Sequence, residues 1–204
     1  GWHCSGVLIH SRMVLTARHC LPARRVALGF DVSHPRAIHH VKKAVPAPDR
    51  SLDAAVLVLD TAVDMPVAPW RSASDNAPPL GFLRAVGFGS TNRLLNRSFG
   101  RKRFVETVST GWGCDRYRAA ETQCREDAEL VLTGGANRDT CNGDSGGPVF
   151  EQYLHRRRLL AITSRAADPT GGGCGSGGIY VRVDRLDPWL RQETSSRENE
   201  EKHR

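Results

Sequence analysis

The apolar residues of this chain come in short runs that turn residues separate. Each run is two to six residues long, is rich in Val, Ile, Leu and Phe, and is bounded by Gly, Pro, Asn or Asp. The runs are 6–9, 13–16, 26–30, 54–59, 83–88, 104–108, 130–132, 149–150, 159–163 and 178–183. No helical pattern of about 12 or more residues lies between them. The chain is therefore predicted to be all-β, a barrel or a sandwich, and not an alternating α/β fold.

Two segments outside these runs have helical features. Residues 119–129 are polar and fit either a short helix or a loop closed by a disulfide. Asp184 fits a helix N-cap and Pro188 fits the first turn, so we predict a helix over 184–191. Residues 192–204 are nearly all charged or polar, and we predict a disordered tail there.

Length and charge limit the possible functions only weakly. At 204 residues the chain suffices for one large domain or for two small halves that share a core. Its net charge of +7 favours acidic partners, nucleic acid or anionic surfaces, although a soluble basic surface explains the same charge. Two basic runs, 101–103 and 156–158, keep a polyanion-binding module as an alternative. No apolar stretch approaches about 20 residues, so we expect no membrane helix.

The six cysteines stand at positions 4, 20, 114, 124, 141 and 174. An even number in a chain of this length favours disulfides that staple loops onto a core. The dipeptides His3-Cys4 and His19-Cys20 offer mixed zinc ligands, but no Cys-x-x-Cys spacing is present and one zinc site leaves four cysteines unexplained. We therefore expect an oxidised, exported protein with no metal and no other cofactor.

Residues 139–149 carry the strongest chemical signal, Asp-Thr-Cys-Asn-Gly-Asp-Ser-Gly-Gly-Pro-Val. A serine among glycines has an accessible hydroxyl, and the N–H groups of Gly143 and Ser145 can point at one oxyanion. The bland alternative is a glycine-rich turn with a bystander serine. The same glycines fit the G-x-S-x-G elbow of α/β-hydrolases, but that fold requires a histidine late in the chain, and only His155 and His203 follow. A general base is therefore expected upstream.

His19 and Asp53 are the candidates for that base and its carboxylate partner. His19 follows a predicted strand and precedes Cys20, an anchored position that the other histidines lack. Asp53 opens the apolar run 54–59, where an acid is costly unless it is hydrogen-bonded. A buried carboxylate would fix the tautomer of the imidazole. The plainer interpretation is that Asp53 only begins a strand at a turn.

The order His19, Asp53, Ser145, with these flanking residues, resembles the trypsin/chymotrypsin-like serine protease family. The resemblance covers the chain up to Leu190, and two more segments match: 86–90 is similar to the family's Gly-Trp-Gly segment, and 178–183 to its last strand. The resemblance implies two six-stranded antiparallel β-barrels with the three side chains in the cleft between them. The first barrel is expected to be incomplete here, and a C-terminal helix follows the second.

The resemblance also implies the division of the chain and its disulfides. The predicted parts are a peptidase domain over 1–191, with a first barrel over about 1–63, a connection over about 64–80, a second barrel over about 81–183 and the helix 184–191. The implied disulfides are Cys4–Cys20, Cys141–Cys174 and Cys114–Cys124. The sequon Asn96-Arg97-Ser98 is a candidate glycosylation site.

By resemblance, the site residues take the roles of an acyl-transfer triad. Ser145 attacks the carbonyl, His19 takes and returns the proton, and Asp53 holds His19. The N–H groups of Gly143 and Ser145 stabilise the oxyanion. Asp139, six positions before Ser145, lies by the same resemblance at the base of the specificity pocket, where a carboxylate pairs with a substrate Arg or Lys. The alternative is an ordinary turn aspartate.

Four more residues complete the implied substrate pocket. They are Thr140, Ser164, Ala166 and Gly178. The tripeptide Ser164-Arg165-Ala166 departs from the family's usual Ser-Trp-Gly. We expect Ala166 to narrow the entrance slightly and Arg165 to repel basic neighbours in the substrate.

The beginning of the chain departs from the family pattern. Family members usually start with a short apolar segment whose amine pairs with the aspartate before the nucleophile, here Asp144. This chain starts three residues before Cys4 and has no recognisable signal peptide, so we expect a preceding segment and an export signal in the natural protein. Without that partner, we expect Asp144 to swing out and disturb the Gly143 donor.

These inferences predict a secreted or extracellular serine endopeptidase, periplasmic in a bacterium, that cleaves after Arg or Lys through an acyl-enzyme. Its expected partners are protein or peptide substrates and protein inhibitors, without a membrane or nucleic acid, and we expect a monomer. The alternative is a catalytically impaired homologue that acts as a binding module.

Overall fold

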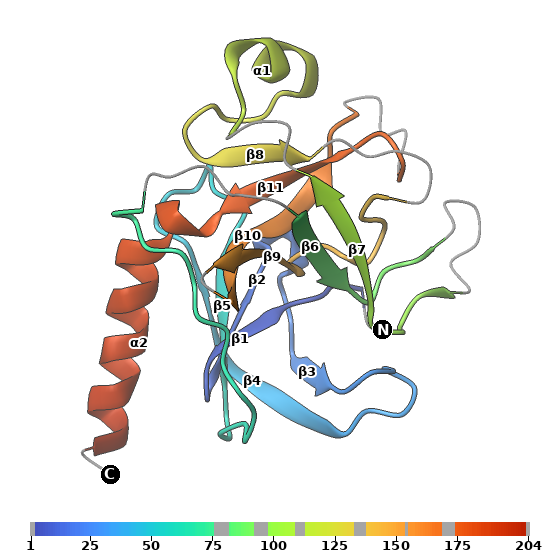
Figure 1. The fold of residues 1–204 in the computed structure, drawn as a ribbon. Coiled ribbons are helices and arrows are strands. Elements are labelled where there is room, and N and C mark those ends of the chain that lie inside the picture. The colour runs from blue at the N-terminus through green and yellow to red at the C-terminus, as the bar shows by residue number, and fades with distance from the viewer. Residues whose placement is uncertain are drawn as a thin grey trace.

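The strands of the protein form two antiparallel sheets, with one helix at the C-terminal end and a short one on the outside (Figure 1). The computed structural model describes residues 3–75, 82–91, 98–108, 113–132, 138–153, 155–168 and 174–202. The predicted all-β class with a C-terminal helix is thereby confirmed. Asn96 of the sequon lies outside the described residues.

The first sheet has five strands in the order β1-β2-β5-β4-β3. They are β1 (Val7–His10), β2 (Met13–Thr16), β3 (Arg25–Leu28), β4 (Ala37–Pro46) and β5 (Ala55–Leu59). Its outer strands are β1 and β3, and a groove of about 750 Å³ is lined by residues of both. This half is therefore an open sheet, in agreement with the predicted incomplete barrel.

The second sheet has six strands in the order β7-β6-β9-β10-β11-β8. They are β6 (Phe82–Gly87), β7 (Arg103–Val108), β8 (Glu129–Leu132), β9 (Pro148–Tyr153), β10 (Arg156–Ala166) and β11 (Gly178–Arg182). The strands β8 and β11 are buried along their whole length, including the charged Glu129 and Arg182 at their ends.

Strand β4 has no counterpart among the predicted runs. Its sequence, AIHHVKKAVP, includes two histidines and two lysines, and its side chains alternate between half-buried and exposed up to Val41. The register with β5 shifts between Val41 and Lys43, and both Lys42 and Lys43 are exposed. The strand forms because β3 and β5 both pair with it, which is information that its own side chains do not carry.

The largest apolar cluster joins both sheets and the C-terminal helix α2 (Asp187–Lys202). It contains Met13 from β2, Ile162 from β10, and Trp189 and Leu190 from α2, packed with thirteen other buried residues. Because residues from both halves share this core, the two sheets pack as one unit.

Helix α2 corrects the predicted end of the chain, because the segment expected to be a disordered tail is helical up to Lys202. Arg197 pairs with Glu200 one turn later, and Glu201 pairs with Arg12 in the turn between β1 and β2. Such pairs and the contact with the first sheet support a helix whose composition alone resembles a coil.

The three disulfides join the predicted partners, Cys4–Cys20, Cys114–Cys124 and Cys141–Cys174. Helix α1 (Arg116–Thr122) lies inside the loop that the second of these closes. The polar segment near residue 119 is therefore both a short helix and a disulfide loop, and the two interpretations of the sequence were compatible.

The described part of the connection, up to residue 75, is bonded to both sheets. The Ala68 N–H donates to the Leu8 carbonyl oxygen of β1 over 2.8 Å. Trp70 forms a parallel bridge with Leu159 of β10. The described part of the connection is thus packed against both sheets.

Some residues of the basic runs that suggested polyanion binding have partners within the fold, whereas Arg156 and Arg157 are exposed. Arg101 pairs with Asp31, and the Lys102 ammonium lies over the Phe30 ring. Arg158 pairs with Glu151 and with Asp75. No helix in the described residues is long and apolar enough to cross a membrane.

Candidate active site

His19 and Asp53 meet at one end of the first sheet. Thr16 of β2 and Ala55 of β5 are register partners in an antiparallel pair, so the chain leaves β2 and enters β5 at the same end of the sheet. His19 lies in a 3-10 turn (Arg18–Cys20) that follows β2. Its Nδ1 is 2.7 Å from Asp53 Oδ2, and its backbone N–H donates to Asp53 Oδ1 over 2.9 Å. The carboxylate therefore fixes both the ring and the backbone of His19.

These hydrogen bonds set the charge of the pair. The bond from the ring to Asp53 raises the pKa of His19 above its usual 6.5, although partial burial opposes this. Burial by itself would raise the pKa of Asp53, but the bonds from the His19 ring, the Ser164 hydroxyl and the His19 N–H lower it overall. An ionised Asp53 holds the ring proton on Nδ1 and leaves Nε2 available.

The Ser164 side chain forms a hydrogen bond with the Asp53 carboxylate. It lies in β10 of the second sheet, is buried, and donates its hydroxyl to Asp53 Oδ2 over 2.7 Å. The sequence analysis expects Ser164 in the wall of the substrate pocket, and the structure adds a hydrogen bond from its hydroxyl to Asp53. Asp53 is thus held by groups from both halves of the molecule.

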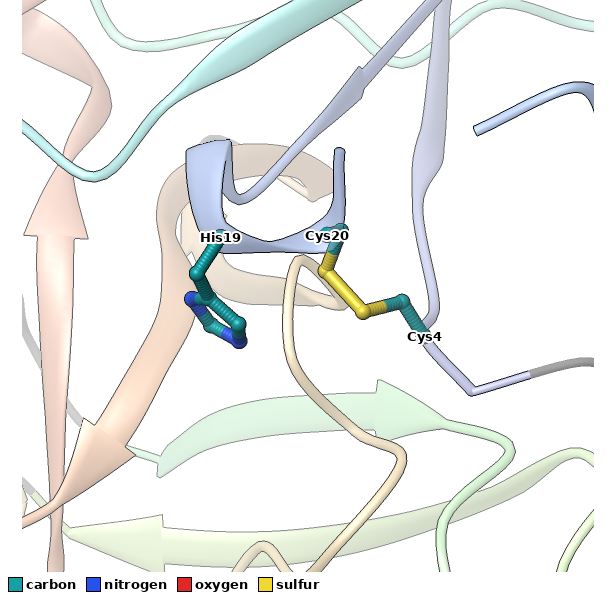
Figure 2. A group of neighbouring side chains, drawn as sticks. All are labelled: Cys4, His19 and Cys20. Carbon is teal, nitrogen blue, oxygen red and sulfur yellow. A yellow bond between two sulfur atoms is a disulfide. The ribbon is translucent and has the colours of Figure 1, made fainter. Parts of the chain in front are cut away.

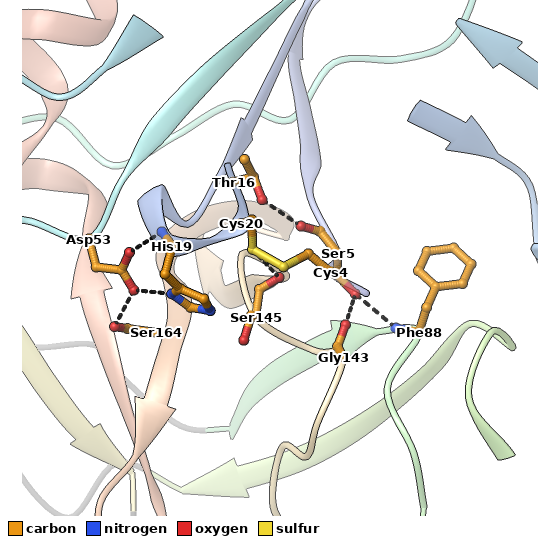
Figure 3. Close-up of a disulfide and its surroundings, with 10 residues drawn as sticks. All are labelled: Cys4, Ser5, Thr16, His19, Cys20, Asp53, Phe88, Gly143, Ser145 and Ser164. Atoms are coloured by element: carbon orange, nitrogen blue, oxygen red, sulfur yellow. Dashed lines mark hydrogen bonds and ion pairs between the residues drawn. A yellow bond between two sulfur atoms is a disulfide. The ribbon is translucent and has the colours of Figure 1, made fainter. Parts of the chain in front are cut away.

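Ser145 approaches this pair from the second half. Its carbonyl oxygen lies 3.7 Å from Sγ of Cys20, the residue after His19, and Figure 3 draws its side chain next to the His19 ring. The Ser5 N–H donates to the same carbonyl oxygen over 2.8 Å. Within the described residues, the Ser145 hydroxyl makes no hydrogen bond to the ring. This bond is often loose in the absence of substrate.

The turn before Ser145 requires glycine. The Asp144 N–H donates to the Cys141 carbonyl oxygen, and Gly143, the third residue of this turn, has a φ of +97°. A Cβ at Gly143 would lie 2.3 Å from the Phe99 ring. In the described part of the chain the N–H groups of Gly143 and Ser145 donate to no other group, so both are available to an oxyanion.

Asp144 does not swing out, contrary to the expectation from the sequence. Its carboxylate points inward, where Oδ1 accepts the Gly89 N–H over 2.8 Å and Oδ2 accepts the Cys141 N–H over 2.9 Å. Burial raises the pKa of Asp144, and these two bonds offset part of the rise. A Cβ on Gly87 or Gly89 would overlap the carboxylate, so glycines at both positions make room for it.

Asp139 is held by backbone N–H groups. Its Oδ1 accepts from Thr140 over 2.8 Å, and its Oδ2 accepts from Gly175 over 2.7 Å and from Gly177 over 3.0 Å. The Thr140 hydroxyl forms a 2.9 Å hydrogen bond with the buried Tyr180 phenol. Three donors on one carboxylate fix its orientation.

The other two predicted pocket residues are neighbours across the sheet. Ala166 of β10 and Gly178 of β11 are register partners. A Cβ at Gly178 would lie 2.6 Å from the Tyr180 hydroxyl oxygen, so a side chain there would require Tyr180 to move.

Arg165 is neutralised by a partner that sequence reasoning missed. Its guanidinium makes two bonds to the buried Glu129 carboxylate, of 2.7 and 2.9 Å, and a third to the Gln123 carbonyl oxygen. The expected repulsion of basic substrate residues is therefore weakened by Glu129. No local signal marks Glu129 as its partner, because the two residues lie 36 positions apart in the chain.

The zinc alternative fails on the state of the sulfur atoms. Donor atoms of Cys4, His19 and Cys20 lie within 4.8 Å of one another. Figure 2 draws these three side chains. The two sulfurs, however, are bonded to each other. A disulfide offers no thiolate to a metal ion.

Comparison with known proteins agrees with this geometry. The family model described as Trypsin matches residues 1–190. Melanization protease 1 of Drosophila melanogaster is 28% identical over 93% of this chain and 58% of its own length. Kallikrein-2 of Homo sapiens is 30% identical over 94% of this chain and 80% of its own length.

The share of each relative that the chain covers varies. It spans 58% of Melanization protease 1 and 61% of CLIP domain-containing serine protease C9 of Anopheles gambiae. The family match, in contrast, extends over nearly the whole chain and includes His19, Asp53 and Ser145. The chain therefore belongs to the trypsin family of serine proteases.

Proposed function

We propose that the protein is a serine endopeptidase that hydrolyses peptide bonds after Arg or Lys. The observation that carries this proposal is the continuous hydrogen-bonded array of Ser164, Asp53 and His19, with Ser145 next to the ring (Figure 3). An array of this kind is what converts a serine hydroxyl into a nucleophile.

The reaction follows from the groups in this array. Ser145 Oγ attacks the substrate carbonyl carbon while its proton moves to Nε2 of His19. The N–H groups of Gly143 and Ser145 stabilise the negative oxygen of the tetrahedral intermediate. His19 then gives its proton to the leaving amine, which leaves an acyl group on Ser145. Water, activated by His19, hydrolyses the acyl-enzyme in the same way.

Specificity for basic residues rests on Asp139. Its carboxylate is oriented by three backbone N–H groups, and a guanidinium or ammonium from the substrate supplies the opposing charge. Ala166 and Gly178, which lie side by side, leave the walls of such a pocket without bulky side chains.

The setting of the enzyme is part of the proposal. Three disulfides are typical of an extracellular or periplasmic protein. Proteins with Arg or Lys at accessible bonds are the proposed substrates, and protein inhibitors that present such a residue are proposed partners. We propose that the protein acts as a monomer.

A serine-reactive fluorophosphonate probe tests the activity directly. We expect the 204-residue chain to be labelled at Ser145, and Ser145→Ala to abolish the labelling. Four peptide substrates that differ only in the residue before the scissile bond, Arg, Lys, Phe or Ala, test the specificity. A preference for Phe over Arg would contradict the role of Asp139. Absence of both labelling and turnover would favour the catalytically impaired homologue.

A further inference from the structure

We propose that Ser5 is a positioning residue for the turn that binds the oxyanion, an inference that rests on the proposed function. Ser5 follows Cys4 and is only 7% exposed. Its hydroxyl lies between two loops of the other half of the molecule (Figure 3). It donates to the Gly143 carbonyl oxygen over 2.8 Å and accepts the Phe88 N–H over 3.0 Å.

The bond to Gly143 fixes one of the two peptide planes that flank this glycine. The plane before it is fixed because the Ser90 N–H donates to the Asn142 carbonyl oxygen over 2.9 Å. The plane after it carries the Gly143 carbonyl, which accepts the Ser5 hydroxyl, and the Asp144 N–H, which donates to the Cys141 carbonyl oxygen over 2.9 Å. Gly143 has a φ of +97° and no Cβ, so its backbone offers little steric resistance to rotation. Three hydrogen bonds on the two planes therefore hold the Gly143 N–H in its direction, and the one from Ser5 is the contribution of the first half of the molecule.

The rest of Ser5 is anchored independently of its hydroxyl. Its N–H donates to the Ser145 carbonyl oxygen, and its carbonyl oxygen accepts the Thr16 hydroxyl over 2.8 Å. The preceding Cys4 is bonded to Cys20, next to His19. Removal of the hydroxyl alone thus leaves the backbone of Ser5 in place. What is lost are its hydrogen bonds with the Gly143 carbonyl oxygen and the Phe88 N–H.

The consequence is a selective loss of transition-state binding. The Gly143 N–H interacts with full negative charge only in the tetrahedral intermediate. Complete removal of an oxyanion donor costs about 100- to 1,000-fold in kcat. Ser5→Ala retains the donor and removes one of the three hydrogen bonds that orient it, so we expect a smaller decrease in kcat, about tenfold, with KM changed by less than about threefold.

Two inhibitors of the same peptide sequence separate positioning from general damage. A peptide aldehyde reacts with Ser145 to form a tetrahedral adduct whose oxygen lies at the oxyanion position. The matched peptide amide does not react. We expect Ser5→Ala to weaken binding of the aldehyde by the same factor by which it lowers kcat/KM. Binding of the amide should be unchanged. Substrate kinetics and both inhibition constants are measured on the 204-residue chain.

Three further variants serve as matched controls. Ser5→Thr and Ser5→Val have nearly the same shape and differ in the hydroxyl, so we expect the aldehyde to bind Ser5→Thr about tenfold better. This pair replaces Ser5→Ala if that variant does not fold. Thr16→Val removes a buried hydrogen bond to the same residue but none to the turn, so we expect a lower melting temperature with an unchanged ratio of aldehyde to amide affinity.

The outcomes separate the two proposals. Equal losses for aldehyde and amide, or an unchanged kcat in Ser5→Ala beside an active wild type, overturn the role of Ser5 alone. A folded wild-type chain that neither cleaves the peptide nor binds the aldehyde overturns the proposed function, and this inference with it.

Discussion

Among single residues, His19 determines how the proposed activity depends on pH. Its hydrogen bond to Asp53 raises the pKa of the imidazole above 6.5, and the ring must be neutral to accept a proton. We expect kcat/KM to rise with pH through a pKa above this value. In Asp53→Asn the charge is lost, so the rising limb should move to lower pH while the plateau falls by about 10⁴-fold. A pH–rate profile of both proteins measures this, and an unmoved limb contradicts it.

Ser164 allows a second prediction for a single side chain. Ser164→Ala removes a 2.7 Å hydrogen bond from the partly buried carboxylate of Asp53 and leaves its charge in place. We expect the pKa of Asp53 to rise and the free energy of unfolding to fall by about 1–3 kcal/mol. Denaturant titration provides the measurement. The control is Ser196→Ala, whose exposed hydroxyl bonds only within α2, and a loss as large in this variant would contradict the prediction.

The residues of the site differ in whether the neighbouring sequence marks them. His19, Asp53 and Ser145 were predictable because each stands beside a short apolar run or a glycine-rich turn that marks its setting. Ser5 was not, because its partner Gly143 lies 138 positions away and a serine after a cysteine has no distinctive pattern. Asp144 was wrongly expected to swing out, because the sequence does not reveal that two backbone N–H groups meet its carboxylate.

Among the elements, α2 depends on a carboxylate at its first residue. Asp187 accepts the Trp70 indole N–H over 2.7 Å and the Ala73 N–H over 2.9 Å. Its pKa is lowered, since these bonds and Arg191 outweigh the effect of burial. These hydrogen bonds attach the helix to the connection between the two sheets.

Replacement of this carboxylate tests how much the attachment of α2 stabilises the protein. We expect Asp187→Asn to lower the free energy of unfolding by about 1–3 kcal/mol at pH 7, because an amide accepts these bonds more weakly. A lowered folded-state pKa gives stability that is present above the unfolded value of 3.8 and is lost as the pH falls through the folded value. The difference between wild type and variant should therefore narrow below about pH 4. Denaturant titrations at neutral and acid pH measure it.

Elements with an apolar pattern were predictable, and those held by their surroundings were not. The buried strand β5 is predictable because it is a continuous apolar run. Strand β4, with its two histidines and two lysines, and the charged second half of α2 are ordered by pairing and by contacts with the first sheet. Composition does not report such contacts, so β4 was not predicted and the end of α2 was predicted to be disordered.

At the level of the whole molecule, a buried ionic network ties the connection to the second sheet. Arg71 is 1% exposed and makes two 3.0 Å bonds to the Glu151 carboxylate. Arg158 contacts Glu151 and Asp75. Together with the core that both sheets share, this network predicts that the two halves unfold in a single transition.

Neutralisation of one carboxylate tests this cooperativity. Glu151→Gln removes one of the two carboxylates that pair with Arg71 and Arg158, and Asp75 alone remains. We expect the free energy of unfolding to fall by about 3–5 kcal/mol while the transition stays single. Tryptophan fluorescence and far-UV circular dichroism should report the same midpoint. Glu106→Gln, in the exposed pair with Arg84, is the matched control and should cost less than about 1 kcal/mol. Separated midpoints would contradict the prediction.

Ser145 is supported from both sides, since its carbonyl oxygen accepts the Ser5 N–H from the first half while Gly146 donates to Thr163 of β10. A chain emerging from synthesis, with one half still unformed, lacks one of these supports and carries an inert alcohol. Under the proposed function, reactivity would then arrive only when both halves of the molecule have folded against each other.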